Sequence, residues 1–169
     1  MSGRSRPVEG AFRYRHPLEV RFGDTDAMGH VNNAAYLAYF EAARAGYYLR
    51  LTGHPFGHGP EARRHTFVVA EAHIAYRAPA FFGEPLVCEM RIAWVSRSSF
   101  GVEYRVVSEG GPIAPARSIA DGTTTQVMVD PASSRATRFP ADLLAAIEAF
   151  EGRPVPRRFP ADPVGEPPA

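Results

Sequence analysis

The feature that most constrains this chain is a long helical segment that is apolar on nearly every side. It begins at Asn32 or Asn33, either of which can cap it, and it runs to about Leu51, where Thr52-Gly53 ends it. Its apolar residues are Tyr36, Leu37, Tyr39, Phe40, Ala42, Ala43, Tyr47, Tyr48 and Leu51. Only three residues carry charge: Glu41, Arg44 and Arg50. A helix without a wide polar face must be covered by other elements on most sides.

Four strand-like segments follow this helix and could cover it. They span residues 66–78, 84–95, 99–108 and 116–129, and Pro, Gly or Asp-Pro bound them. In the second segment the alternating residues Leu86, Cys88, Met90, Ile92 and Trp94 predict one buried face. A first strand at 16–22 and a short helix at 140–150 complete the order. These elements predict an α+β fold, in which a curved antiparallel sheet wraps around one long central helix.

Length and composition indicate one ordinary globular domain. We place it at residues 12–151, and we expect 1–11 and the Pro-rich 152–169 to be flexible tails. A net charge of +1 without a basic block argues against nucleic acid as a partner, and no apolar run is long enough for a membrane span. The single cysteine, Cys88, excludes an internal disulfide and suits a reducing cytoplasm.

The turn before the long helix concentrates the chemistry-bearing residues. It holds Asp24, Asp26, His30 and the pair Asn32-Asn33. A helix start offers unpaired N–H groups and positive dipole potential for an oxyanion. A carboxylate and an imidazole beside it can transfer a proton or attack a carbonyl carbon. Taken alone, the two acids could equally well cap and shape the turn.

The motif from Asp24 to Tyr36, Asp-x-Asp-x-x-Gly-His-Val-Asn-Asn-x-x-Tyr, resembles the signature of hot-dog-fold acyl-CoA thioesterases related to 4-hydroxybenzoyl-CoA thioesterase. The resemblance extends from about residue 14 to 151. It implies a single hot-dog fold that hydrolyses acyl-CoA to free acid and CoA without a cofactor. It also implies that Asp26 is the catalytic carboxylate, as general base or nucleophile, and that the backbone N–H of Asn33 polarises the thioester carbonyl.

His30 has two interpretations. It is similar to the histidine of plant acyl-carrier-protein thioesterases, whose motif Asp-x-Asn-x-His departs from this chain at Met28. It either orients Asp26 or a water molecule as part of the catalytic set, or it caps the helix. We expect Asp24 to be structural.

Further residues are expected to bind the substrate. Tyr36 lies one turn into the helix and would form a wall of the acyl pocket, while the apolar helix face favours an apolar or aromatic acyl group. The segments Tyr-Arg-x-Pro and Val-Ser-Arg-Ser-Ser resemble strand ends that the family places near the pantetheine and nucleotide of CoA. They contribute Arg77, Arg97, Ser98 and Ser99, whose alternative role is that of solvated strand ends.

Two other functions remain open at this point. A hot-dog hydratase or dehydratase also uses an acid and a histidine, but its motif Asp-x-Asn-Pro-x-His has a proline and a longer gap than this chain. A non-catalytic acyl-CoA sensor would carry a DNA-binding segment, which neither tail supplies. No metal site is expected, since His54 and His58 lie in a Pro/Gly loop without further ligands.

The chain is expected to form a homo-oligomer, a dimer or a tetramer. One sheet wrapped on one helix leaves open strand edges that invite pairing. The resemblance adds that hot-dog subunits pair so that two of them share each site.

Overall fold

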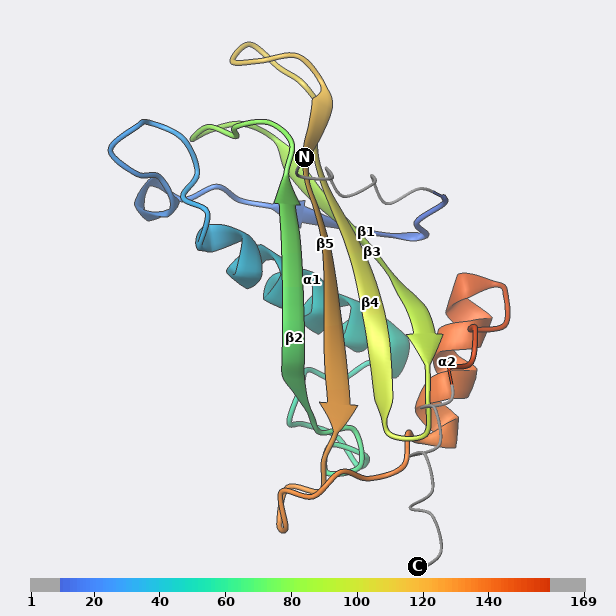
Figure 1. The fold of residues 1–169 in the computed structure, drawn as a ribbon. Helices are drawn as coiled ribbons and strands as arrows, with labels where there is room; N and C mark the ends of the chain where they lie inside the picture. The colour runs from blue at the N-terminus through green and yellow to red at the C-terminus, as the bar shows by residue number, and fades with distance from the viewer. Residues whose placement is uncertain (1–9, 159–169) are drawn as a thin grey trace, which may run out of the picture.

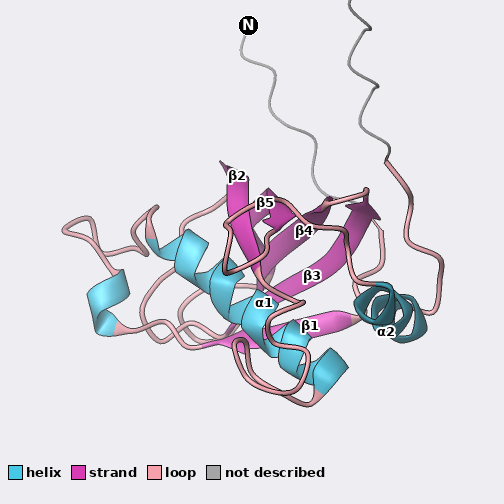
Figure 2. Cartoon of the chain, turned by 90° about the horizontal axis from the view of Figure 1, so that it is seen from below, coloured by secondary structure: helices cyan, strands magenta, loops and turns pink. Residues whose placement is uncertain are grey.

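The computed structural model describes residues 10–158 and has one antiparallel sheet. Its elements are β1 (Tyr14–Leu18), the 3-10 turn η1 (Phe22–Asp24), α1 (Ala35–Thr52), β2 (Phe67–Tyr76), β3 (Leu86–Val95), β4 (Ser99–Ser108), β5 (Arg117–Met128) and α2 (Ala141–Glu151). The strand order is β1-β3-β4-β5-β2, and every neighbouring pair is antiparallel. The sheet curves around α1, and α2 lies beside β3 (Figures 1 and 2). The predicted sheet wrapped around one long helix is confirmed.

Helix α1 packs so closely on the sheet that one strand position must lack a side chain. The Phe40 ring is fully buried and stacks on Tyr104, with ring centroids 4.2 Å apart. Gly122 of β5 lies beneath the same ring, where an added Cβ atom would clash with Phe40 Cε2. Such a glycine marks a close approach between helix and strand. Among the described residues, neither α1 nor α2 is long and apolar enough to cross a membrane.

The helix starts at Ala35 with Ala34 at its N-cap position and no side-chain capping bond there, so the predicted cap at Asn32 or Asn33 is wrong. The Asn32 side chain accepts the Ala34 N–H at 2.9 Å, and its carbonyl accepts the Ala35 N–H at 3.0 Å. At the other end Gly53 adopts the left-handed conformation, with φ of 75°, as a C-terminal glycine does. The expected helix end at Thr52-Gly53 is therefore confirmed.

A β-bulge in β3 overturns one expectation about the core. The register with β4 shifts between Ile92 and Trp94, so the alternation of side chains reverses there. Leu86, Cys88, Met90 and Ile92 are buried, as expected. Trp94 instead lies on the outer face, where it crosses Gly101 and the Arg158 guanidinium covers its ring at 5.0 Å.

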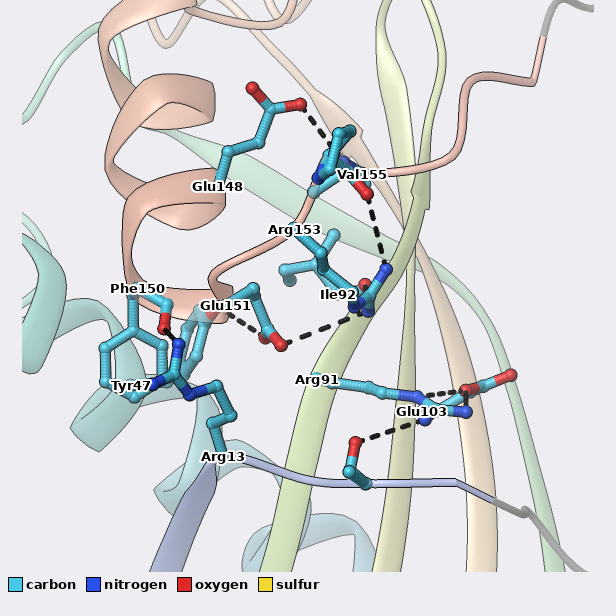
Figure 3. Close-up of polar contacts among 12 residues, drawn as sticks. Arg13, Tyr47, Arg91, Ile92, Glu103, Glu148, Phe150, Glu151, Arg153 and Val155 are labelled. Atoms are coloured by element: carbon cyan, nitrogen blue, oxygen red, sulfur yellow. Dashed lines mark hydrogen bonds and ion pairs between the residues drawn. The ribbon is translucent and has the colours of Figure 1, made fainter.

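The chain after α2 remains attached to the domain up to residue 158 (Figure 3). Arg153 Nη2 donates to the Ile92 carbonyl at 3.2 Å, and the Val155 N–H donates to Glu148 Oε1 at 3.0 Å. The Val95 N–H donates to the Pro156 carbonyl, and the Arg158 N–H donates to the Val95 carbonyl. Residues 152–158, expected to belong to a flexible tail, are therefore part of the packed domain. The expectation for 1–9 and 159–169 lies outside the described residues.

The contact between Phe40 and Gly122 can be tested by adding a single methyl group. We expect Gly122→Ala to lower the free energy of unfolding by about 1–3 kcal/mol, because the buried Phe40 ring cannot move away freely. Gly23→Ala is the matched control, since a Cβ there meets nothing within 4 Å. Urea unfolding of both variants measures the difference. Equal stability of the two variants would contradict this account of the packing.

Candidate active site

Residues 24–33, here called the acidic turn, fold back on themselves immediately before α1. The Asp26 N–H donates to the His30 carbonyl at 3.0 Å, and the Asn32 N–H donates to the Asp24 carbonyl at 2.8 Å. The reversal between these two bonds needs a residue with positive φ, which Gly29 supplies at 81°. The acidic turn therefore places Asp26 and His30 opposite each other.

Asp26 has one engaged carboxylate oxygen and one that faces His30. Its Oδ1 accepts the Met28 N–H at 2.9 Å, which fixes the side-chain rotamer. Its Oδ2 lies 3.7 Å from His30 Nδ1, which is longer than a hydrogen bond. The Asp26 and His30 side chains are 27% and 29% exposed, so a substrate can reach both of them.

Asp24 joins the acidic turn to α1. Its Oδ2 accepts the Arg21 N–H and the Tyr39 hydroxyl, both at 2.9 Å. Burial raises the pKa of Tyr39, and the hydrogen bond to the Asp24 carboxylate raises it further, so the hydroxyl stays protonated as a donor. This geometry supports the expected structural role of Asp24.

The backbone N–H of Asn33 is a free donor at the start of α1. Asn32 accepts the next two N–H groups, as described above, while no acceptor for the Asn33 N–H is found within residues 10–158. The Asn33 carbonyl accepts the Tyr76 hydroxyl at 3.0 Å, which ties this peptide to β2. A fixed, unpaired N–H at a helix start can bind an oxyanion.

Tyr36, in the first turn of α1, is only 2% exposed. Its ring makes edge contacts with Tyr39 and Tyr76, at centroid distances of 5.8 and 5.2 Å. Burial, together with the nearby Tyr76 and Glu84, raises its pKa to about 12. The neutral ring is packed among its aromatic neighbours, and its role as a wall of the acyl pocket stays a prediction.

The buried ion pair between Glu84 and Arg117, which the sequence did not predict, supports the loop that contacts the acidic turn. Glu84, 3% exposed, pairs with Arg117 and accepts Ser108 Oγ at 2.7 Å and the Phe81 N–H at 3.1 Å. Burial alone would raise the pKa of Glu84, but the donors from Arg117, Ser108 and Phe81 more than offset it and lower the pKa.

The Glu84–Arg117 pair fixes the loop that the acidic turn leans on. Arg117 also donates to the Pro79 carbonyl, so both sides of Ala80 are held. The Ala80 carbonyl accepts the Val31 N–H at 2.8 Å, within the acidic turn. Glu84 and Arg117 are 33 residues apart and belong to no motif, so no local pattern could have indicated this support.

The expected CoA-binding residues lie at two ends of the sheet (Figure 1). Arg77 follows Tyr76 directly and lies near the acidic turn, where its Nε donates to Asp121 Oδ2 at 2.7 Å. Arg97, Ser98 and Ser99 lie at the β3–β4 hairpin, beyond the far end of β3. A strand of ten residues such as β3 spans roughly 30 Å. One chain therefore brings Arg77, but not the hairpin residues, to Asp26.

The remaining candidate groups show no second chemical centre. Cys88 is fully buried, and burial raises the pKa of its thiol, as expected of an unreactive core cysteine. In the described part of the chain, no three side chains of His, Cys, Asp or Glu are arranged to hold a metal ion.

Comparison with known proteins identifies the family of this chain. The family model of the thioesterase-like superfamily matches residues 20–147. The acyl-CoA thioester hydrolase YbgC of Escherichia coli is 29% identical over 133 residues, which cover 78% of this chain and 93% of that protein.

Solved structures show the same fold. A thioesterase from Thermus thermophilus, complexed with coenzyme A and Zn, has a TM-score of 0.71 and 32% identity, covering 85% of this chain and 98% of that one. The 4-hydroxybenzoyl-CoA thioesterase of Pseudomonas sp. strain CBS-3, at 22% identity and a TM-score of 0.69, covers 79% and 97% and shares the fold. These findings confirm the predicted resemblance and the hot-dog architecture: the chain belongs to the thioesterase-like superfamily of enzymes.

Proposed function

We propose that the protein is an acyl-CoA thioesterase whose reaction takes place at the acidic turn. The observation that carries this proposal is the pairing of a reachable Asp26 carboxylate with the unpaired Asn33 N–H at the start of α1. Thioester hydrolysis needs a base or nucleophile and a donor for the carbonyl oxygen. Both are held by backbone hydrogen bonds within one turn.

The two groups divide the chemistry between them. The Asn33 N–H and the positive end of the α1 dipole hold the thioester oxygen as it becomes an oxyanion, a contribution of about 3 kcal/mol. Asp26 Oδ2 either takes a proton from the attacking water or attacks the carbonyl carbon itself. In the second route CoA leaves as a thiolate and water then cleaves the mixed anhydride. His30, whose Nδ1 lies 3.7 Å from Oδ2, is placed to orient the water molecule beside Oδ2 in both routes.

The protein pairs with a second copy through β2. This edge strand pairs only with β5 in the sheet, and every residue from 68 to 73 is exposed. Val68 and Val69, 51% and 45% exposed, add apolar area to an edge whose backbone can pair with an identical strand. A two-fold axis beside β2 would make the two β2 strands antiparallel. The start of β2 in one subunit would then lie next to the end of β2 in the other.

The acyl group enters a cleft between α1 and the start of β2. This cleft has a volume of about 370 Å³ and is lined by Tyr48, Phe56, Phe67 and Val69, with Glu41 and Arg44 also facing it. In the two-fold pair, the cleft of one subunit would lie beside the acidic turn of the other. Its aromatic walls favour an apolar or aromatic acyl group.

Two further expectations stay predictions. The buried free thiol of Cys88 is consistent with a cytoplasmic protein, because a reducing compartment keeps thiols free. We propose that Arg77 contributes to binding the CoA phosphates, in addition to its ion pair with Asp121.

The role of Asp26 is tested by Asp26→Asn. We expect kcat to fall by about 10²–10⁴-fold, because the amide can neither accept the proton nor attack, while acyl-CoA still binds. Asp24→Asn is the control. It should lower the thermal stability, since it weakens the contacts with Arg21 and Tyr39, and it should change kcat little. Release of CoA, followed with a thiol reagent, measures turnover. Unchanged kcat in Asp26→Asn, or hydration of an enoyl-CoA without CoA release, would contradict the proposal.

The assembly is tested at the β2 edge. We expect wild-type protein to be at least a dimer in light scattering, and Val69→Lys to be a monomer with strongly reduced activity. Ile113→Lys is the matched control, because Ile113 is 49% exposed but lies in the β4–β5 hairpin, away from β2. A wild-type monomer that is fully active at micromolar concentration would rule out the shared site.

The substrate class is tested with a panel of acyl-CoA thioesters. We expect succinyl-CoA to have a kcat/KM more than about tenfold below the values for benzoyl-, hexanoyl- or palmitoyl-CoA, because moving a carboxylate from water into a cleft with mainly apolar and aromatic walls is costly. The same acyl groups on an acyl-carrier protein should be poorer substrates than on CoA. A preference for succinyl-CoA or for the carrier-bound thioesters would change the assigned substrate while leaving the reaction intact.

A further inference from the structure

A small cavity, here called the core cavity, lies between α1, α2 and the strands β2, β3 and β4. It has a volume of about 40 Å³, and its walls include Leu51, Ile92, Val102 and Ile147. A water-sized group needs about 10–15 Å³ by this measure, so the cavity can hold about three such groups. Protein cores are close-packed and contain few voids larger than a water molecule, which makes this one a candidate binding site.

The surface that lines the core cavity is almost entirely apolar. The hydroxyl groups of the two tyrosines in its wall are bonded elsewhere. The Tyr47 hydroxyl donates to Glu151 Oε1 at 2.9 Å, and the Tyr48 hydroxyl is hydrogen-bonded to His65 Nδ1 at 2.9 Å. A buried water molecule needs two to four polar partners, which this surface does not offer. The core cavity is therefore suited to methyl and methylene groups.

The core cavity adjoins the cleft that we propose for the acyl group. Four residues line both spaces: Arg44, Tyr48, Phe56 and Phe67. Arg44 Nη1 donates to the Tyr104 hydroxyl at 2.9 Å, so the carbon stem of Arg44 is left to line the apolar cavity. The four side chains therefore form the wall between the cleft and the core cavity.

Phe56 is the part of this wall that can move. It lies in the loop between α1 and β2, whereas the other three residues belong to a helix or a strand. Its ring stacks on Tyr48 at a centroid distance of 4.4 Å and meets Phe67 edge-on at 5.2 Å. Tyr48 is fixed by His65, whose Nε2 is in turn 3.1 Å from Asp142 Oδ2. Rotation of the Phe56 ring breaks ring contacts but no side-chain hydrogen bond, so it can open a path from the cleft into the core.

We propose that the core cavity receives the methyl end of a straight aliphatic acyl chain, which reaches it past Phe56. The inference rests on the proposed function, because it extends the acyl cleft of that reaction into the core. Each methylene group that leaves water for an apolar site improves binding about fourfold. Acyl chains that reach the core cavity are therefore better substrates than chains that end in the cleft.

The size of the core cavity sets an upper limit on the chain. Ile92, Val102 and Ile147 line the cavity but not the cleft, and they are between 1% and 3% exposed. They form a closed inner end, since a close-packed core does not yield freely to additional methylene groups. The value of kcat/KM should therefore rise with chain length, reach a maximum and then fall.

Partial filling of the core cavity tests the proposal with whole substrates. Val102→Ile adds one methylene group to the cavity, and we expect it to shorten the acyl chain with the highest kcat/KM by about one carbon atom. Val106→Ile is the matched control, because Val106 is buried on the same strand but does not line the cavity. Release of CoA from a series of straight-chain thioesters, from butyryl- to palmitoyl-CoA, measures the optimum. The same optimum in Val102→Ile and wild type would overturn the proposal.

Enlargement of the core cavity should have the opposite effect. Ile147→Val removes one methylene group from its wall, and we expect the optimal chain to become about one carbon atom longer. Ile119→Val, at a fully buried position outside the cavity, should leave the optimum unchanged. A general loss of stability cannot move the optimum in two directions. A shift to shorter chains in Ile147→Val, or an equal shift in Ile119→Val, would contradict the proposal.

The path past Phe56 is tested with a double variant. We expect Phe56→Ala to raise kcat/KM for the optimal chain relative to butyryl-CoA, because the entrance to the core cavity then stays open. Adding Val102→Ile to Phe56→Ala should abolish this gain, since the chain again lacks space at its end. A gain that persists in the double variant would place the chain in the widened cleft alone and would overturn its passage into the core.

Xenon tests the core cavity without catalysis, because apolar cavities take up this atom. Under xenon pressure we expect shifts of the methyl NMR signals of Met90 and Ile147, which line the cavity. The signals of Ile119 and Met128, which are equally buried elsewhere, should not move. Absence of these shifts would overturn the proposal. If wild-type protein releases no CoA from any acyl-CoA, the proposed function fails, while xenon still decides whether the core cavity takes up apolar groups.

Discussion

The close approach of α1 to the sheet is the contact on which the rest of this structure depends. Phe40 fills the space that Gly122 leaves open and stacks on Tyr104, so the helix can shift neither along nor away from the strands without losing buried area. The N-terminus of α1 is therefore a fixed point. The Asn33 N–H lies only two residues before the first helical residue, so the position of the helix N-terminus sets the position of this donor.

Fixing the helix would be of little use if the acidic turn could move independently. It cannot, because it is attached on three sides: Asp24 to Tyr39 of α1, Asn33 to Tyr76 of β2, and Val31 to Ala80 of the β2–β3 loop. The last attachment would be weak if its loop were mobile. The buried Glu84–Arg117 pair prevents that movement. Burying this ion pair is costly, and its role is to hold the loop in position.

The sequence predicted what depends on local pattern and missed what depends on topology. Periodicity and turn chemistry were sufficient to predict the apolar helix, the four strands and the acidic turn, because each of them is formed by consecutive residues. The outward position of Trp94 was missed because a bulge inserts one residue without any sequence signal. The pairing of Glu84 with Arg117 was missed because folding alone brings a loop and β5 together.

The net charge of +1 does not say where the charged side chains lie. Within residues 10–158, seven arginines have a carboxylate oxygen within 4.0 Å, whereas Arg97, Arg138, Arg157 and Arg158, which line one cleft, have none. Arg138 and Arg157 are far apart from Arg97 in sequence, and only the return of the chain along Val95 sets them side by side. The acidic turn and this cleft occupy opposite ends of one sheet. The antiparallel two-fold pair proposed above would make those ends adjacent, and the β2 edge, which pairs only with β5, is the strand through which it would form.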